Sequence, residues 1–484
     1  MSVFENTEPK NVFHYFEEIC RIPHGSGNTQ AISDYCAEFA KAHGLACRQE
    51  SCGNVIIWKD ASPGYEDADT VMLQGHMDMV AVKEADCDID METEGLRPAV
   101  TGDGEWIYAK GTSLGGDDGI AIAYALAILA DDTLRHPALE AVFTVDEEIG
   151  LLGAAVLDTS DLKSRILLNM DSEDDGIFLT SCAGGATFTA YAPAPREEKS
   201  GVVYELEIGG LQGGHSGAQI HLGRANANLI FDRFLAQVGE TVDFSVGDFS
   251  GGEKDNAIPN RCRAVLVASA GNAAKLEEAA ADFSAVVRAE YAVTEPDFFL
   301  TLTRQEETSA AVLSGRAAET LTALLEHLPS GVLRMMPDFP DMVQTSLNLG
   351  ILRLEKKEFS MTFSVRSASA TEKEWVLKRM KDLTEMVGGR WELSGDYPAW
   401  EYRQDSKIRQ VMAETYGELT GQAPILTGIH AGVECGLILE KMPGIDCISY
   451  GPQMRDIHTA RERLNIASVQ KNYELTTQVL EKLR

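Results

Sequence analysis

The chain has 484 residues, of which 44% are hydrophobic and 24% are charged, and its formal net charge is −33. This length exceeds what one ordinary core fills, so two domains are expected. The strong negative charge argues against nucleic acid or an anionic membrane as a partner. No apolar run reaches the roughly 18–20 residues needed to span a bilayer.

Neither the first residues nor the cysteines point to secretion. Residues 1–10 are acidic and polar, without the basic and apolar stretches of a signal sequence. The nine cysteines are an odd number and include no close-spaced CxxC pair. We therefore expect reduced thiols and a cytoplasmic protein.

The first third of the chain alternates between predicted helices and predicted buried strands. Amphipathic helices are predicted over 8–22 and 29–43, the second ending at Gly44, a favoured C-terminal cap. After a long polar excursion over 81–110, an Ala-rich run predicts a buried helix over 120–130. Short apolar runs predict buried strands at 55–58, 71–73, 141–145 and 166–168. This alternation predicts an α/β fold with a doubly wound, mostly parallel sheet.

The sequence pattern changes near Gly185. Alternating segments, typical of antiparallel strands with one exposed face, occupy 186–191, 202–208, 263–268 and 359–366. Helices are expected between them, over about 223–238, 273–291, 316–327 and 371–387. We therefore predict an α+β lid domain at 186–399, inserted into a catalytic domain made of 1–185 and 400–484.

Five short blocks of metal-binding side chains stand along the chain, three of them directly after apolar runs. Because ligands of open α/β folds gather beyond the carboxyl ends of the strands, we expect the blocks to converge there. Two histidines and several carboxylates in one place suit a hydrolytic zinc site with more than one metal. The blocks contain His76 and Asp78, Asp117 and Asp118, Asp146 to Glu148, Asp171, and His458.

Single blocks also have purely structural explanations. Aspartate is favoured at the N-terminal cap of a helix, so Asp117 or Asp118 could serve only that purpose. The three carboxylates of 146–148 would repel one another beyond a buried strand unless a cation lay nearby. His76 and Asp78 share one face of an extended backbone, which allows the carboxylate to orient the imidazole. Together the blocks favour a metal site.

In this order the blocks resemble the di-zinc exopeptidase family that contains the carnosinases. The similarity extends from Arg21 to Val469. Gly116 and Asp118 stand where the relatives usually have Ala and Asn, and the segment 459–462 replaces their usual Ser-Pro pair. The similarity also covers Leu114-Gly115-Gly116-Asp117-Asp118-Gly119, Asn169-Met170-Asp171-Ser172-Glu173, Gly213-Gly214-His215-Ser216-Gly217, Asn256-Ala257-Ile258-Pro259-Asn260 and residues 429–437.

The resemblance implies a role for each residue of the site. Spacing alone does not distinguish Glu147 from Glu148, but the family assigns Glu147 as the general base. Asp117 would bridge two zinc ions, or Co²⁺ or Mn²⁺ in their place, and Asp78 would orient His76. One metal would be completed by His76 and Asp171, and the other by Glu148 and His458.

The predicted insert supplies further candidates. His215, in a Gly-rich turn, would donate a hydrogen bond to the oxyanion; without the resemblance it would be a simple turn residue. Arg366 ends a predicted strand, and its planar guanidinium suits bidentate capture of a peptide's terminal carboxylate, although a surface arginine is the alternative. Asn256, His430 and Glu434 are expected to border the substrate pocket. The remaining histidines are expected to be surface or packing residues, namely His14, His24, His43, His136, His221 and His327.

The function implied by the resemblance is that of a cytoplasmic, zinc-dependent dipeptidase. Its substrates would be small peptides, including dipeptides that end in histidine, and the chain would form a homodimer through the insert. An aminotripeptidase or an N-acyl amino-acid deacylase is the alternative within the same chemistry. A catalytically silent peptide-binding protein would have lost a ligand or the base, whereas each of those positions is occupied here.

Overall fold

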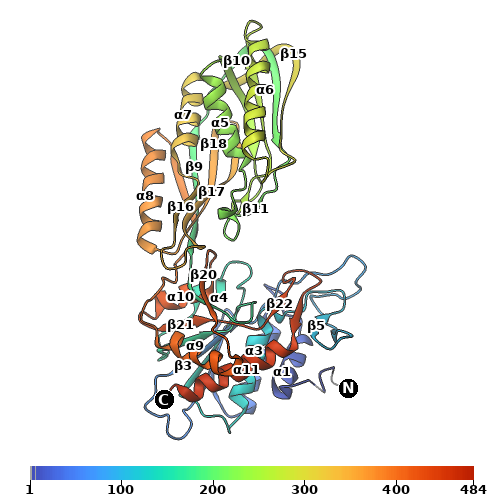
Figure 1. The fold of residues 1–484 in the computed structure, drawn as a ribbon, viewed down its shortest axis with the longest axis vertical. Helices are drawn as coiled ribbons and strands as arrows, with labels where there is room; N and C mark the ends of the chain where they lie inside the picture. Colours follow the sequence, from blue (N-terminus) through green and yellow to red (C-terminus); the bar gives the residue numbers. More distant parts are fainter. Residues whose placement is uncertain (1–2, 6) are drawn as a thin grey trace. The chain divides into compact units, whose positions relative to one another are not determined.

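The computed structural model describes residues 3–5 and 7–484, and the chain divides into two compact units (Figure 1). Unit 1 comprises the residues up to Cys182, Tyr402–Gly428 and Val433–Arg484, and unit 2 comprises Ala183–Glu401 and Ile429–Gly432. The sequence placed the boundaries at 185 and 400. It gave no sign that residues 429–432 belong to the second unit.

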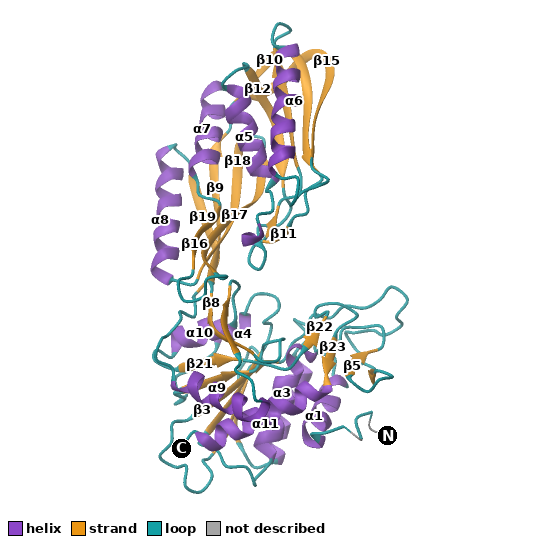
Figure 2. Cartoon of the chain, in the orientation of Figure 1, coloured by secondary structure: helices purple, strands orange, loops and turns teal. Residues whose placement is uncertain are grey.

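The centre of unit 1 is an eight-stranded sheet (Figure 2). Its strands follow the order β1 (Ala46–Gln49), β2 (Val55–Lys59), β6 (Leu139–Thr144), β3 (Val71–His76), β7 (Ile166–Asn169), β21 (Asp446–Ser449), β8 (Ile177–Cys182) and β20 (Ile425–Ile429). Strands β6, β3, β7 and β21 run parallel, whereas β1, β2 and β8 pair antiparallel. The parallel centre confirms the predicted α/β fold.

The central strands are buried and mostly apolar, with Gln74 and His76 as the polar residues of β3 and Glu140 and Thr144 as those of β6. All six residues of β3 and of β6 are buried. The register pairs His76 with Thr144 and Gln74 with Asn169, so the three strands end at the same edge of the sheet. This edge is where the predicted metal blocks begin.

The helices of unit 1 pack on this sheet and on one another. They are α1 (Lys10–Cys20), α2 (Gln30–Ala42), α3 (Gly116–Ala130), α4 (Leu152–Val156), α9 (Lys407–Thr420), α10 (Glu434–Lys441) and α11 (Ile466–Lys482). Helix α3 is buried from Gly116 to Leu129, as its apolar sequence predicts, and it packs on α1 and β3. None of the helices in the described ranges is long and apolar enough to cross a membrane.

A small antiparallel sheet takes two of its strands from residues 81–110, which the sequence presents only as a polar excursion. Its order is β22 (Met454–Arg455), β23 (Arg463–Asn465), β5 (Trp106–Ala109) and β4 (Pro98–Val100). Strand β23 follows His458 closely in the chain, so this sheet joins the last metal block to the early part of unit 1.

Unit 2 is built on a nine-stranded antiparallel sheet with helices along it (Figure 2). The strand order is β15 (Phe299–Leu313), β10 (Arg196–Gly209), β14 (Cys262–Ala268), β12 (Phe244–Gly251), β17 (Val343–Leu354), β18 (Glu358–Ser367), β9 (Gly184–Pro193) and β19 (Arg390–Tyr397), with β16 (Gly331–Met335) beside β17. The helices are α5 (Ala227–Gly239), α6 (Ala273–Glu290), α7 (Gly315–His327) and α8 (Ala370–Met386), which confirms the four predicted helices to within a few residues.

Unit 2 consists of two halves with the same connectivity. Each half runs strand, helix, strand, strand, helix, strand, first as β10–α5–β12–β14–α6–β15 and then as β9–α7–β17–β18–α8–β19. In both halves the spatial order of the strands is fourth, first, third, second, the ferredoxin-like arrangement. The halves join where Ser250 of β12 pairs antiparallel with Arg353 of β17. The first half is thus inserted between β9 and α7 of the second.

Candidate metal centre

The strand ends of unit 1 bring the five predicted metal ligands together. β3 ends at His76, β6 ends shortly before Glu148, β7 ends two residues before Asp171, and Asp117 lies at the start of α3. His458 arrives from the turn that precedes β23. All five side chains belong to unit 1, so their contacts lie within one compact unit.

The five ligands form two groups that share Asp117. The Nε2 atom of His76 lies 3.1 Å from Asp117 Oδ1 and 3.6 Å from Asp171 Oδ1. The Nε2 atom of His458 lies 3.1 Å from Asp117 Oδ2 and 2.8 Å from Glu148 Oε1. Within each group the ligand atoms lie within 4.8 Å of one another. Asp117 therefore contributes one oxygen to each of the two groups.

Asp78 orients both a ligand and the segment that carries Glu147. The Nδ1 atom of His76 is 2.9 Å from the backbone carbonyl of Asp78 and 3.4 Å from its carboxylate, and a proton held there leaves Nε2 free for a metal. The Asp78 carboxylate accepts from the backbone N–H groups of Glu147 (2.9 Å) and Glu148 (3.3 Å). It also accepts from the Ser26 hydroxyl at 2.8 Å. The side chain is fully buried, so its position is fixed by these bonds.

Three residues in or beside the site have left-handed backbone conformations that non-glycine residues rarely adopt. The φ angles are 54° at Asp146, 55° at Asp456 and 57° at His458. Such conformations cost roughly 1–3 kcal/mol each and persist where the surroundings hold them. The Asp146 carboxylate accepts from the backbone N–H of Gly27 at 2.6 Å, which fixes the turn immediately before Glu147.

The carboxylates are crowded and buried, and the pKa values show the consequence. Burial, opposed by His76 and reinforced by Asp171, raises the pKa of Glu147 to about 9. Burial likewise raises the pKa of Asp171 to about 7. Burial opposes ionisation of Asp117 too, but hydrogen bonds from His458 and His76 hold its pKa below the usual range. Mutually repelling carboxylates beside two histidines keep their charge when cations share the site, so this donor set fits divalent metal ions.

Glu434 lies in a polar network behind the strand ends, where we had expected it to border the substrate pocket. Its side chain has no exposed surface and accepts hydrogen bonds from Gln74 Nε2 and from Thr144 Oγ1, the latter at 2.6 Å. Asn169 in turn donates to Gln74 Oε1 at 2.6 Å. Glu434 has no exposed surface in this structure, so its predicted place beside the substrate stays a prediction. Local sequence patterns did not predict this network, although Gln74 inside β3 is a visible signal.

The alternative in which an aspartate caps helix α3 is not seen. The cap position is Gly115, which has φ 65°, and no side chain near it in sequence accepts a hydrogen bond from the first turn. The second aspartate, Asp118, is fully buried and accepts from the backbone N–H of His76 at 3.2 Å. Asp118 is therefore a support for the His76 backbone and is absent from both ligand groups.

In unit 2, a short two-stranded antiparallel sheet brings His215 close to Asn256, which directly precedes its second strand. His215 ends β11 (Gly214–His215), which pairs with β13 (Ala257–Ile258). The backbone carbonyl of Asn256 accepts from the N–H of Ser216 at 2.8 Å, and the Asn256 side chain is exposed. The Nδ1 atom of His215 accepts from the backbone N–H groups of Gly217 and Ala218 at 3.2 and 3.1 Å. The Nε2 atom is therefore the protonated one and can donate outward.

Arg366 and His430 lie close to this two-stranded sheet in the same unit. Arg366 is 9% exposed, its Nη1 donates to the Tyr397 hydroxyl at 3.1 Å, and its Nε has no hydrogen-bond partner among the described residues. His430 is 7% exposed, and its Nε2 lies 2.7 Å from the Ser346 hydroxyl. Burial and then the Arg366 cation lower the pKa of His430 to about 3, and the same two causes lower the pKa of His215. The cluster therefore carries one fixed positive charge and two neutral imidazoles at neutral pH.

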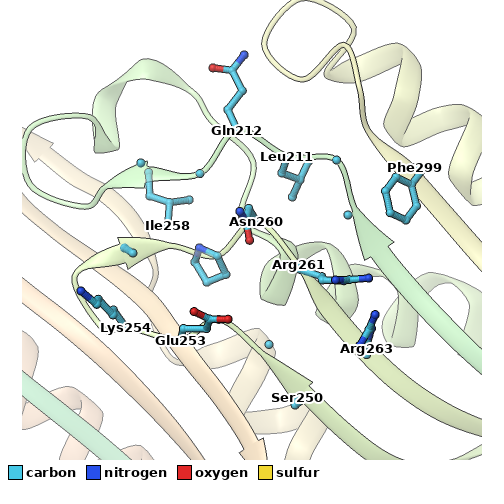
Figure 3. Close-up of a pocket in the computed structure, with 18 of the residues that line it drawn as sticks. Leu211, Gln212, Ser250, Glu253, Lys254, Ile258, Asn260, Arg261, Arg263 and Phe299 are labelled. Carbon is cyan, nitrogen blue, oxygen red and sulfur yellow. The ribbon is translucent and has the colours of Figure 1, made fainter. Parts of the chain in front are cut away.

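The loops that lead into this two-stranded sheet also border a hollow of about 830 Å³ (Figure 3). Its lining includes Gly213 and Gly214 directly before His215, and Ala257 directly after Asn256. Further lining residues are Leu211, Gln212, Ile258, Asn260, Arg261 and Arg263. The hollow contains none of the predicted metal ligands, so it does not compete with unit 1 as the metal centre.

Comparison with known proteins identifies the family. The profile of peptidase family M20/M25/M40 matches residues 72–482. The chain is 34% identical over 485 residues to the cytosol non-specific dipeptidase of Escherichia coli (strain K12), and the match covers 100% of this chain and 99% of that protein. The crystal structure of aminoacylhistidine dipeptidase from Vibrio alginolyticus is similar with a TM-score of 0.93 and 34% identity, over 100% of this chain and 99% of that chain. The aminopeptidase PepT of Bacillus cereus shares the fold, with a TM-score of 0.55 and 15% identity over 99% of each chain. With this agreement over its whole length, the chain belongs to peptidase family M20/M25/M40.

Proposed function

We propose that this protein is a metal-dependent dipeptidase. The observation that carries the proposal is the pair of ligand groups that share Asp117, beside the half-buried carboxylate of Glu147. Two relatives similar over the full length are named as dipeptidases, one non-specific and one for aminoacylhistidine substrates. The proposed substrates are therefore dipeptides, including those that end in histidine. The cytosolic relative supports a cytoplasmic location.

The proposed cofactors are two zinc ions, with Co²⁺ or Mn²⁺ able to replace them. His76, Asp171 and one oxygen of Asp117 would hold the first ion, and Glu148, His458 and the other oxygen of Asp117 the second. Imidazole nitrogens and carboxylate oxygens are ordinary zinc ligands. When bound, such ions polarise a carbonyl group and lower the pKa of water toward about 7.

Glu147 is proposed as the general base. Its carboxylate would take the proton of the attacking water and deliver it to the nitrogen of the leaving amine. The backbone N–H of Glu147 is tied to Asp78, which also orients His76. One buried side chain thus holds the base and a ligand in a fixed relation, which is what proton transfer at a defined distance requires.

Unit 2 is proposed to recognise the substrate and to assist the reaction. The guanidinium of Arg366, oriented by Tyr397, has free donors for the terminal carboxylate of a dipeptide. His215 would donate its Nε2–H to the oxyanion of the tetrahedral intermediate. Asn256 and His430 would complete the surroundings of the substrate. Residues 186–399 would then act as a lid that limits the length of the peptide.

The arrangement within unit 2 supports a proposal about whether His215 and Arg366 serve the same active site. His215 belongs to the first half of unit 2, whereas Arg366 and Ser346 belong to the second, and all three gather around His430 within one chain. We therefore propose that the two groups serve the same active site, even if the protein is a homodimer. Mixing His215→Ala with Arg366→Ala protein under demonstrated subunit exchange should leave activity unrestored, because every lid would still lack one group. Restored activity would separate the two residues. Mixing His215→Ala with Glu147→Ala protein tests whether unit 2 acts on the metal centre of its own chain.

The function is tested with a substrate panel. Zinc-loaded protein is incubated with Ala-His, β-Ala-His, Gly-Gly-Gly and an N-acetyl amino acid, and released amines are quantified. We expect hydrolysis of the dipeptides and little or none of the tripeptide or the acetylated amino acid. Preferred cleavage of Gly-Gly-Gly would indicate an aminotripeptidase, and of the N-acetyl compound a deacylase. Binding without hydrolysis of any of the four would indicate a silent peptide-binding protein.

A further inference from the structure

The carboxylate of Glu462 holds four consecutive backbone N–H groups at the start of helix α3. Its Oε2 accepts from Leu114 at 2.7 Å and Gly115 at 3.1 Å, and its Oε1 accepts from Gly116 at 2.8 Å and Asp117 at 3.3 Å. The Glu462 side chain is only 3% exposed. The last of these four groups belongs to the residue that both ligand groups share.

The side-chain acceptor for all four of these N–H groups is Glu462. The first N–H groups of a helix have no partners within the helix. No nearby side chain caps α3, and Asp117 and Asp118 depart from helical backbone angles. A buried N–H without an acceptor costs roughly 1–3 kcal/mol, and a negative charge is favoured at a helix N-terminus. Glu462 supplies the acceptors from 345 residues away.

At its own end, Glu462 is fixed in the turn that presents His458. The Thr459 hydroxyl donates to the carbonyl of Asp456 at 2.6 Å and accepts from the N–H of Arg461 at 3.1 Å. The N–H of Glu462 donates to the carbonyl of Thr459 at 3.1 Å. Directly after the turn, β23 pairs with β22 and β5. One hydrogen-bonded turn therefore holds His458 and Glu462 in a fixed arrangement relative to each other.

We infer that Glu462 is a positioning residue for both metal positions, because it fixes the backbone of Asp117 relative to His458. This inference rests on the ligand set proposed above. His458 also lies 3.1 Å from the Asp117 carboxylate, but a ring nitrogen that ligates a metal no longer bonds to that oxygen. The contacts of Glu462 use backbone N–H groups alone. They stay in place when the ligand atoms are occupied.

Glu462 lies in the segment 459–462, where the sequence departs from its relatives' usual Ser-Pro pair. The chain offers a matched control in Glu140, which is 2% exposed and accepts from the backbone N–H groups of Lys163 and Ser164. Glu140 lies near the amino end of β6, whereas the metal blocks follow the carboxyl ends of the strands. It therefore reports what losing a buried backbone clamp does without a role at the metals.

The test compares Glu462→Gln with Glu140→Gln in the full-length chain. The amide keeps one acceptor oxygen, so two of the four N–H groups lose their partner. Both variants and wild type are stripped of metal and titrated with zinc against a chromophoric chelator, and thermal midpoints are recorded without metal. We expect zinc affinity to fall about 10- to 100-fold for Glu462→Gln, the usual cost of losing a group that supports ligands. Glu140→Gln should bind zinc as wild type does.

Each outcome decides between positioning and simple folding support. Wild-type zinc affinity in Glu462→Gln, with both variants lowering the metal-free midpoint alike, would make Glu462 a structural clamp and overturn the inference. If Glu462→Gln does not yield soluble protein, Glu462→Asp, which keeps the charge on a shorter side chain, is judged by the same two results. Failure of wild type itself to bind zinc would instead overturn the proposed ligand set.

Discussion

Replacing Asp117 by asparagine tests the shared ligand most directly. Asp117 contributes one oxygen to each ligand group, 3.1 Å from His76 Nε2 and 3.1 Å from His458 Nε2. An amide of the same shape has only one oxygen and no charge. Asparagine would leave each proposed ion with a weaker set of ligands. It would also remove the negative charge that screens the two proposed cations from each other. We therefore expect both affinities to fall by at least roughly 100-fold, the upper end for loss of a supporting group.

The consequence for stability follows from mass action. With free zinc buffered at 100 times the wild-type dissociation constant, each bound ion stabilises the folded state by about 2.7 kcal/mol, so two ions give about 5 kcal/mol. A 100-fold weaker site at the same zinc concentration gives about 0.4 kcal/mol per ion, below 1 kcal/mol in total. At about 2–4 °C per kcal/mol for a unit of this size, zinc should raise the wild-type midpoint by about 10–20 °C and the variant's by about 3 °C or less.

The assay is differential scanning calorimetry with and without chelator, together with elemental analysis of zinc per chain. Asp118→Asn is the matched control, because Asp118 is the adjacent buried aspartate and belongs to neither ligand group. It should retain the zinc-dependent rise in midpoint. Should Asp117→Asn keep that rise and Asp118→Asn lose it, the shared ligand would be Asp118, and the reasoning from the two groups would be refuted.

Further predictions concern the base, the substrate and the second unit. Glu147→Gln should lower kcat by roughly 10²–10⁴-fold while elemental analysis still finds the metal of wild type, since a base need not be a ligand; loss of zinc would make Glu147 a ligand instead. Arg366→Lys keeps the charge but loses the planar fork, so kcat/KM should fall for free-acid dipeptides and change little for amidated ones; equal losses would mark Arg366 as structural. Burial, reinforced by Glu326, raises the pKa of Asp232 to about 7 in the folded state, above its ordinary 3.8. Folded protein therefore binds the extra proton between these values, and wild type loses stability as pH rises through this window. Asp232→Asn should be more stable than wild type at pH 8 and nearly equal at pH 4 in urea unfolding, and a difference independent of pH would contradict this.

The sequence predicts that several candidate ligands lie together because they follow apolar strands of a parallel sheet. Carboxyl ends of adjacent parallel strands meet at one edge, so His76, the pair Glu147 and Glu148, and Asp171 could be placed together from local patterns. The choice of Glu148 as the ligand rests on the family resemblance. The late His458 could not be placed from local patterns, because the turn that carries it depends on backbone angles that the sequence does not announce. For the same reason the role of Glu462 is invisible locally, since its partners are backbone groups of distant residues.

Unit 2 shows the opposite limit. Its helices and many strands follow from periodicity, but the equivalence of its two halves lies in connectivity and strand order. Amphipathic helices and half-exposed strands can satisfy the same topology with unrelated residues, so the two halves need not resemble each other in sequence. The return of residues 429–432 to this unit depends on packing, as when His430 bonds to Ser346 of β17.

The two units differ in the charge of the groups that the proposed mechanism uses. Unit 1 gathers carboxylates whose burial opposes ionisation, a cost that bound cations offset. In unit 2 the Arg366 cation lies beside two histidines whose pKa values it helps to lower, so these imidazoles are neutral where a substrate carboxylate would meet the guanidinium. A neutral His215 can donate a hydrogen bond to a developing oxyanion without attracting the carboxylate of the intact substrate. In the proposed mechanism, recognition by charge would then belong to Arg366 and transition-state stabilisation to His215. Lysine at 366 should therefore impair substrate selection, whereas alanine at 215 should impair turnover.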